Sequence, residues 1–156
     1  MGFWERLIGA RPGEEKDRQR LLPELLANYR AEARLARQIR EHAAHAPHQA
    51  GAEGLRAVAE EQDRIVQLLH DKIVALGGEV NHKVAPPKGG KNYWVRIVLD
   101  LEDTLALRRR YNEQASYRDP DFPDIVALYR TLEHKKARLS ALLRDLALRA
   151  DPHALD

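Results

Sequence analysis

The sequence lacks cysteine entirely, and its single methionine is the first residue. The absence of cysteine excludes disulfides, thiolate zinc sites and a cysteine nucleophile, and it fits a reducing compartment. No apolar run approaches the ~18 residues of a membrane span, and the N-terminal stretch has no signal-peptide pattern. The sequence therefore favours a soluble cytoplasmic protein.

Glycine and proline are scarce as well, with 9 and 8 residues among 156, and they occur in clusters. The long stretches between the clusters are rich in alanine, leucine, arginine and glutamate, which are strong helix formers. A chain of this length is sufficient for one hydrophobic core. These features predict a single all-α domain.

No strong excess of either charge is present, because 26 basic residues are balanced by 24 acidic ones and the net charge is +2. A surface that binds nucleic acid needs a clustered basic stripe. The densest basic run, Arg108 to Arg110, fans out over most of a helical turn and makes no such stripe. We therefore expect no nucleic-acid partner.

The N-terminal 20 residues are predicted to form a short amphipathic segment followed by a charged connector, "GEEKDRQR". Phe3, Trp4, Leu7 and Ile8 share one face at helical spacing. This face is expected to pack on the protein's own helices, and docking on a membrane or a partner through residues 1–12 is the alternative.

Four long amphipathic segments follow, and each carries apolar residues at steps of three and four. Their predicted limits are residues 21–46, 52–76, 93–117 and, after the turn at 118–124, about 125–149. Residues 151–156 form a short tail. Helices of this length must bury their apolar faces on one another.

The segment "EVNHKVAPPKGGK", residues 79–91, separates the second helix from the third. Fully extended at ~3.3 Å per residue, it reaches about 43 Å, which exceeds the ~38 Å length of a 25-residue helix. It is long enough to cross the whole molecule. We predict an antiparallel four-helix bundle over residues 21–150, made of two helical hairpins joined by this crossover.

Polar residues interrupt the apolar stripes near the middle of each helix. Glu32, Gln62 and Lys135 stand at stripe positions, and Glu102 lies at about the same height as Lys135. Buried together, these four would have to satisfy one another, because an unpaired buried charge is costly. The alternative is that Lys135 and Glu32 extend to solvent. A lysine in the cluster argues against a transition metal there.

The stretches "DRIVQLLHDKIVALGG" and "DPDFPDIVALYRTLEHKKARLSALLRDL", with the long crossover, resemble the ferritin-like superfamily, including its bacterioferritin and rubrerythrin branches. The resemblance covers roughly residues 20–150. It implies two iron or manganese ions held by a Glu on helices one and three and by a Glu-x-x-His pair on helices two and four.

The implied ligand positions are only partly filled. Glu102 matches the third-helix carboxylate, and Glu32 is a candidate for the first. The positions of the two Glu-x-x-His pairs hold other residues: Gln62 and Ile65 on helix two, and on helix four Lys135 and Arg138 or, with one residue of slack, Lys136 and Leu139.

The resemblance therefore implies a bundle that has lost its di-metal centre and serves as a non-catalytic binding, structural or assembly module. We expect no cofactor, and we expect self-association, for example as a dimer. The alternative is an active di-iron or di-manganese oxidoreductase or iron-handling protein. Its metal ligands would then be Glu32, Glu61, Glu102 and Glu133.

The motif "EHAAHAPH" places His42, His45 and His48 three residues apart near the end of the first helix. Two histidines at this spacing on a helix can share a metal ion. Histidines in a last turn also complement the helix dipole and bond free carbonyls. Both interpretations remain open from the sequence.

Overall fold

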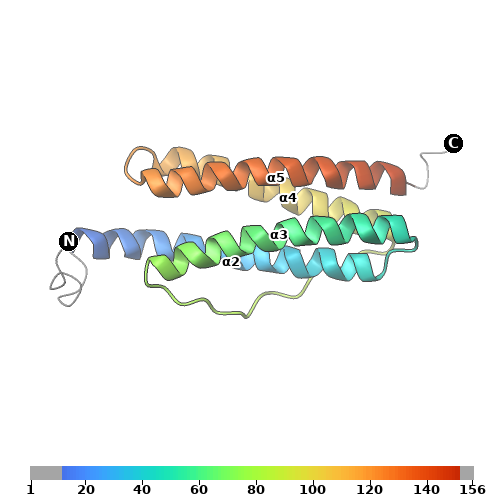
Figure 1. The fold of residues 1–156 in the computed structure, drawn as a ribbon, viewed down its shortest axis with the longest axis horizontal. Helices are drawn as coiled ribbons and strands as arrows, with labels where there is room; N and C mark the ends of the chain where they lie inside the picture. The colour runs from blue at the N-terminus through green and yellow to red at the C-terminus, as the bar shows by residue number, and fades with distance from the viewer. Residues whose placement is uncertain (1–11, 152–156) are drawn as a thin grey trace.

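The structure, a computed structural model, describes residues 12–151, and within that range the chain is entirely helical apart from its connections. Figure 1 shows the helices, which are α2 (Pro12–Ala44), α3 (Gln49–Ala75), α4 (Tyr93–Arg118) and α5 (Pro123–Ala150). The described residues contain no strand. The prediction of an all-α chain with four long helices is confirmed.

Local sequence signals account for several helix ends. The side chain of Asn92 accepts a hydrogen bond from the backbone N–H of Val95 at 2.9 Å, which caps the start of α4. Gly77 follows α3 with φ of 78°, a conformation that glycine adopts without a Cβ clash. Pro123 begins α5, where a missing N–H costs little.

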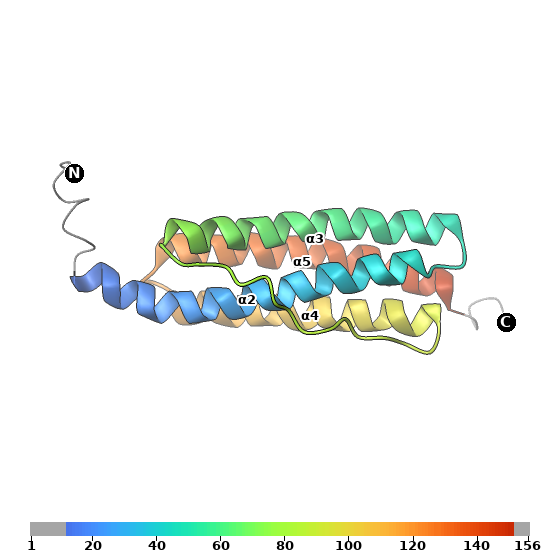
Figure 2. The same cartoon turned by 90° about the horizontal axis from the view of Figure 1, so that it is seen from below.

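The helices pack as two hairpins, α2 with α3 and α4 with α5, and the hairpins meet where α2 lies against α4 and α3 against α5. The colour gradient in Figures 1 and 2 shows that packed neighbours run in opposite directions. Each fully buried aliphatic side chain in the core contributes about 1.5–3 kcal/mol. The core includes the fully buried residues Leu25, Ile39, Leu55, Ile65, Ile97 and Leu132.

The first helix is longer than the sequence suggested. We expected a charged connector up to residue 20 and a helix from residue 21, with Pro23 in its first turn, but α2 begins at Pro12 and contains Pro23 in its interior. Pro23 is exposed, and its surroundings are strong helix formers, so the helix continues through it. The predicted boundary at residue 20 is therefore wrong. Phe3, Trp4, Leu7 and Ile8 lie outside the described residues.

The connection between the hairpins, residues 79–91, is here called the strap. Figure 2 shows it running from the end of α3 across α2 to the start of α4 at the other end of the bundle. The prediction of a crossover along the bundle is confirmed. Val80 packs against the core near its beginning, and Arg34 Nε donates to the Pro86 carbonyl oxygen at 3.0 Å farther along.

None of the described helices combines the length and the apolar character that a membrane span requires.

Candidate functional site

Hydrogen-bonded side-chain pairs occur from one end of the α2–α4 contact to the other, and this contact is here called the polar seam. Side chains of the two helices pair in opposite order along the chain, as expected for helices that run in opposite directions. The hydrogen-bonded pairs are Glu24–Arg118, Asn28–Gln114, Glu32–Tyr111, Gln38–Asp100 and His42–Asp100. The central cluster, described next, includes one pair of this seam, Glu32–Tyr111.

At the middle of the bundle, Glu32, Gln62, Tyr111 and Lys136 form the central cluster, one residue from each helix, and all four side chains are fully buried. The Lys136 ammonium lies 2.6 Å from Glu32 Oε2 and donates to Gln62 Oε1 at 2.7 Å. The Tyr111 hydroxyl donates to Glu32 Oε1 at 2.8 Å. The Gln62 amide donates to the Glu32 carboxylate and to its backbone carbonyl oxygen.

The hydrogen bonds define the charges of this cluster. The Glu32 carboxylate accepts bonds from three groups and donates none, as an ionised carboxylate does. A buried carboxylate requires a cation beside it, and Lys136 supplies one. Burial lowers the pKa of Lys136 below its ordinary 10.5, and the attraction of Glu32 opposes this shift. Burial, and then the Glu32 charge, raises the pKa of Tyr111 well above 10.0.

The structure brings together half of the predicted polar cluster. Glu32 and Gln62 lie in it, but Lys135 is only half-buried and Glu102 is exposed. The expectation for Lys135 and Glu102 is therefore wrong. A neighbour on a helix points about 100° away, so the one-residue shift from Lys135 to Lys136 decides which lysine is buried.

The segment "EHKKARL" contains two adjacent lysines, and the sequence alone permits either of them to face the core. The buried stripe of α5 passes through Leu132, Lys136 and Leu139, whereas the predicted stripe passes through Leu132, Lys135 and Leu139. Both stripes have helical spacing, so periodicity alone did not distinguish them. Tyr111 was missed because no local pattern indicates that its hydroxyl contacts Glu32, which lies 79 residues away in the sequence.

The side chains at the implied metal-ligand positions do not fit a metal centre. Gln62 bonds Glu32, Ile65 is apolar, and the buried fourth-helix pair is Lys136 and Leu139. A di-iron or di-manganese centre of this kind needs carboxylate and imidazole ligands, and a lysine ammonium repels the ions. Among residues whose side chains are described, no group of three or more His, Asp or Glu is placed to hold a metal ion.

The alternative ligand set is not assembled either. Glu61 pairs with Arg64 on the same helix. Glu133 lies 3.9 Å from both Arg108 and Arg130, and Glu102 is exposed. Glu32 alone is directed into the bundle, so these four carboxylates belong to separate surroundings.

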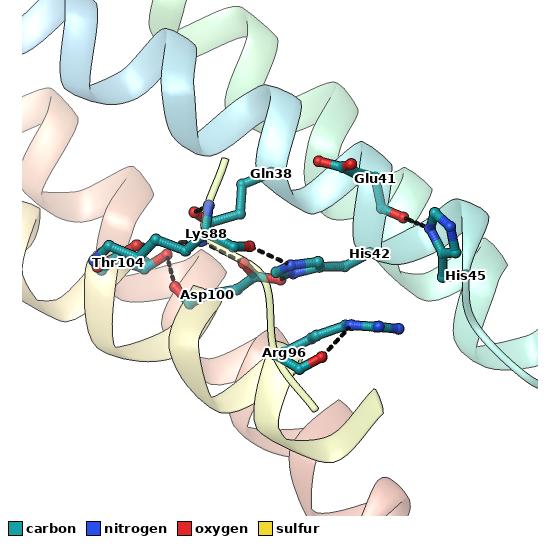
Figure 3. A network of polar contacts seen from close by, with 10 residues as sticks. Gln38, Glu41, His42, His45, Lys88, Arg96, Asp100 and Thr104 are labelled. Atoms are coloured by element: carbon teal, nitrogen blue, oxygen red, sulfur yellow. Dashed lines mark hydrogen bonds and ion pairs between the residues drawn. The ribbon is translucent and has the colours of Figure 1, made fainter. Parts of the chain in front are cut away.

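A second group of polar residues lies where the strap crosses the seam near its other end, with Gln38, His42 and Asp100 buried, and is here called the strap cluster. It consists of Gln38, His42, Lys88, Asp100 and Asp103. Figure 3 shows the His42 imidazole between Asp100 on α4 and the strap. His42 Nδ1 lies 2.8 Å from Asp100 Oδ2, and Nε2 lies 3.0 Å from the Lys88 carbonyl oxygen.

Gln38 completes the strap cluster. Its amide nitrogen donates to Asp100 at 2.8 Å and to Asp103 at 3.1 Å, and its oxygen accepts the Lys88 backbone N–H at 2.9 Å. The Lys88 ammonium bonds Asp103 at 2.7 Å. Both backbone groups of one strap residue are thus held by buried side chains of α2.

The pKa values of His42 and Asp100 are both shifted upward. Burial by itself lowers the pKa of His42, but the hydrogen bond and charge of Asp100 and the bond to Lys88 outweigh it, so the pKa lies above 6.5. Burial raises the pKa of Asp100 above 3.8, against the hydrogen bonds from His42 and Gln38. The pair therefore holds a proton more tightly than the separate groups do.

The three histidines of "EHAAHAPH" do not converge. His42 is buried against Asp100, whereas His45 is exposed and its Nδ1 donates to the Glu41 backbone carbonyl oxygen at 2.9 Å (Figure 3). His48 is exposed at the start of α3. His45 thus fulfils the expectation of a carbonyl bond in the last turn, and the paired-metal interpretation of His42 and His45 has no geometric support.

The third buried group lies at the opposite end of the seam. Arg118 donates from Nε and Nη2 to the two oxygens of Glu24, each at 3.2 Å, and the Tyr129 hydroxyl donates to the same carboxylate at 2.6 Å. Burial, and then the bond to Glu24, raises the pKa of Tyr129 strongly. This group joins α2 to both helices of the second hairpin.

Grooves of about 550 Å³ and 430 Å³ open at opposite ends of the bundle. The first is lined by residues such as Leu76 and Phe122, and the second by residues such as Tyr93 and Trp94. No residue of the central cluster lines either groove, so neither gives access to Lys136.

Comparison of the chain with protein-family models, curated proteins and solved structures yields no match. The functional interpretation therefore rests on the residues and geometry described above.

Proposed function

We propose that this protein is a ferritin-like four-helix bundle in which a lysine has replaced the di-metal centre, and that it serves as a non-catalytic binding, structural or assembly module. One observation carries the proposal. The Lys136 ammonium lies in the middle of the four helices, 2.6 Å from Glu32, where this class of bundle would hold its metal ions.

The composition of the central cluster supports the loss of metal chemistry. Its carboxylate is neutralised by Lys136, and its other polar atoms bond one another. Among buried side-chain nitrogen and oxygen atoms in the described part, Arg18 Nε is the one that lacks a hydrogen-bond partner, and it is not in this cluster. A fully satisfied polar cluster stabilises and specifies a bundle without a ligand.

The topology supports the ferritin-like assignment. Two hairpins are joined by a strap that runs the length of the bundle, which is the arrangement that ferritin-like folds use. The exposed large apolar residues, Val74, Tyr117, Leu142 and Leu148, are spread over α3, α4 and α5. We therefore propose self-association but assign it to no particular face of the bundle. Light scattering of the purified protein measures the oligomeric state.

The decisive experiment is metal analysis of the full chain after anaerobic loading with Fe²⁺ and, separately, Mn²⁺. We expect a metal content near background after desalting. A content of about two ions per chain, as in di-metal bundles, would contradict the proposal and favour the oxidoreductase alternative.

A rebuilt ligand set is the matched comparison. The variant Gln62→Glu, Ile65→His, Lys136→Glu, Leu139→His supplies the two missing Glu-x-x-His pairs while Glu32 stays in place. A gain of bound metal in this variant alone would support the proposed correspondence of positions. Binding by the wild type with loss in Glu32→Gln would instead show that the existing residues form a metal site.

A further inference from the structure

The proton content of the strap cluster follows from its hydrogen bonds. The amide nitrogen of Gln38 faces the carboxylates of Asp100 and Asp103, and its amide oxygen faces the Lys88 backbone N–H. Only this orientation of the amide satisfies all three hydrogen bonds. This orientation leaves Asp100 Oδ2 and the Lys88 carbonyl oxygen as the two partners of the His42 ring.

Both partners of the imidazole are oxygens, and the Lys88 carbonyl can only accept. A neutral imidazole has a single N–H, and it cannot donate to both. The dyad therefore contains one further proton, either on His42 as an imidazolium facing the Asp100 carboxylate or on Asp100 as a carboxyl donating to Nδ1. In each case Nε2 carries the hydrogen that bonds the strap.

Removal of this proton leaves one N–H for two acceptors. Asp100 is then a buried carboxylate, fully shielded from solvent, and the cost of an unpaired buried charge keeps the remaining N–H on Nδ1. The lone pair of Nε2 consequently faces the Lys88 carbonyl oxygen. The contact that is lost is the bond from His42 Nε2 to the Lys88 carbonyl oxygen.

The charged groups around His42 are few. Helix α4 contributes Asp100, which contacts the ring, and Arg96, whose charge opposes protonation of His42. It also contributes Asp103, which is linked to the dyad through Gln38. The strap contributes the Lys88 ammonium, which Asp103 neutralises. On α2 itself, Glu41 and His45 point away from the ring (Figure 3). Within residues 12–151, the groups that shift the pKa of His42 all come from α4 and the strap.

The two strap contacts that flank Lys88 do not depend on pH near neutrality, whereas the one nearer α3, between His82 Nδ1 and the Tyr29 hydroxyl at 3.4 Å, involves a histidine. Arg34 and Arg96 donate to the carbonyl oxygens of Pro86 and Gly90, each at 3.0 Å, and arginine remains charged throughout. Between them, Lys88 is held by the bonds to His42, Gln38 and Asp103, and a Cβ added at Gly89 would meet nothing within 4 Å. The strap can therefore lift at residues 87–89 while its flanks stay in place.

We propose that the His42–Asp100 dyad is a proton-operated latch: it holds the Lys88 backbone while it carries the shared proton and releases this part of the strap when the proton leaves. The released state uncovers Gln38 and the dyad at one end of the polar seam. This device regulates the surface of the bundle, and it is independent of the absence or presence of a metal at the central cluster.

The test uses a nitroxide label on Gly89→Cys, in a chain that has no other cysteine. We expect the label to be immobile near pH 6 and to become mobile along the titration of His42, which is followed by NMR between about pH 5.5 and 9. In the unlabelled wild type, exchange of the Lys88 amide, corrected for its intrinsic pH dependence, should rise by about tenfold over the same titration.

Two substitutions give the latch its controls. In Asp100→Asn, the side-chain amide can donate to Nδ1 of a neutral His42 imidazole, so Nε2 keeps its hydrogen without an added proton. The label should therefore stay immobile over the whole pH range. His45→Gln, one turn away and exposed, should leave the wild-type transition unchanged. The proposal would be overturned if label mobility and Lys88 exchange did not change along the titration of His42. It would also be overturned if Asp100→Asn showed the same transition as the wild type. The exchange measurement uses the wild-type chain and therefore does not depend on the folding of any variant.

Discussion

The Lys136 ammonium lies 2.6 Å from the Glu32 carboxylate at the centre of the bundle, and both side chains are 0% exposed. Because the two come from different hairpins, the pair joins α2 to α5, and the two charges neutralise each other. Buried pairs of this kind specify an arrangement more strongly than they stabilise it.

Removal of the cation leaves Glu32 buried without its charge partner. We expect Lys136→Met to lower the free energy of unfolding by about 3–5 kcal/mol, as measured by urea denaturation. Adding Glu32→Gln removes the second charge and leaves an amide oxygen for the Tyr111 hydroxyl, so the double variant should recover most of the loss.

The neighbouring lysine is the matched control for this prediction. Lys135 is half-buried and outside the cluster, so Lys135→Met should change the free energy of unfolding by less than about 1 kcal/mol. Equal losses from both substitutions would show that Lys136 is not the charge partner of Glu32.

The stability of the folded state should fall as pH rises above neutrality. The pKa of His42 is raised above 6.5 in the folded protein, so its contribution is complete below about pH 6.5 and is lost as pH rises through the folded-state value. Thermal melts from pH 6 to 9 measure this loss. Asp100→Asn should flatten the curve, because it removes the carboxylate that holds the proton; an unchanged curve would contradict the assignment.

Two tyrosines should resist ionisation while the bundle is folded. Burial raises the pKa of both Tyr111 and Tyr129 above 10.0, so their stabilising contribution is lost as pH rises beyond that value. Lys136, with its lowered pKa, acts in the opposite direction up to about pH 10.5. We expect part of the tyrosinate absorbance to appear only with loss of helical circular dichroism. Complete ionisation of the folded chain would contradict the burial of these hydroxyls.

The Glu24–Arg118 contact should depend on the shape of guanidinium as well as on its charge. Arg118 bonds both oxygens of Glu24, which a single ammonium cannot reproduce. Arg118→Lys should therefore cost about 1–2 kcal/mol in urea denaturation. Arg110→Lys, at an exposed position of the same helix, is the control and should be nearly neutral. A neutral Arg118→Lys would show that only charge matters.

The sequence by itself determined the class and layout of this protein. Apolar steps of three and four, and the clusters of proline and glycine between the apolar stretches, predict four long helices and a crossover at residues 79–91, because these signals are local and each follows from backbone preference. Glu32 and Gln62 were also recognised, since a polar residue within an otherwise apolar stripe is visible in one dimension.

Only the tertiary structure decided which partners these residues meet. A rotation of one residue on α5 exchanges Lys135 for Lys136, and the periodic pattern permits both because it does not record which face packs against the other hairpin. The pairing of His42 with Asp100 and Lys88 joins residues that are 58 and 46 positions apart. Such contacts depend on the meeting of two hairpins and a strap in space, and no local preference specifies them.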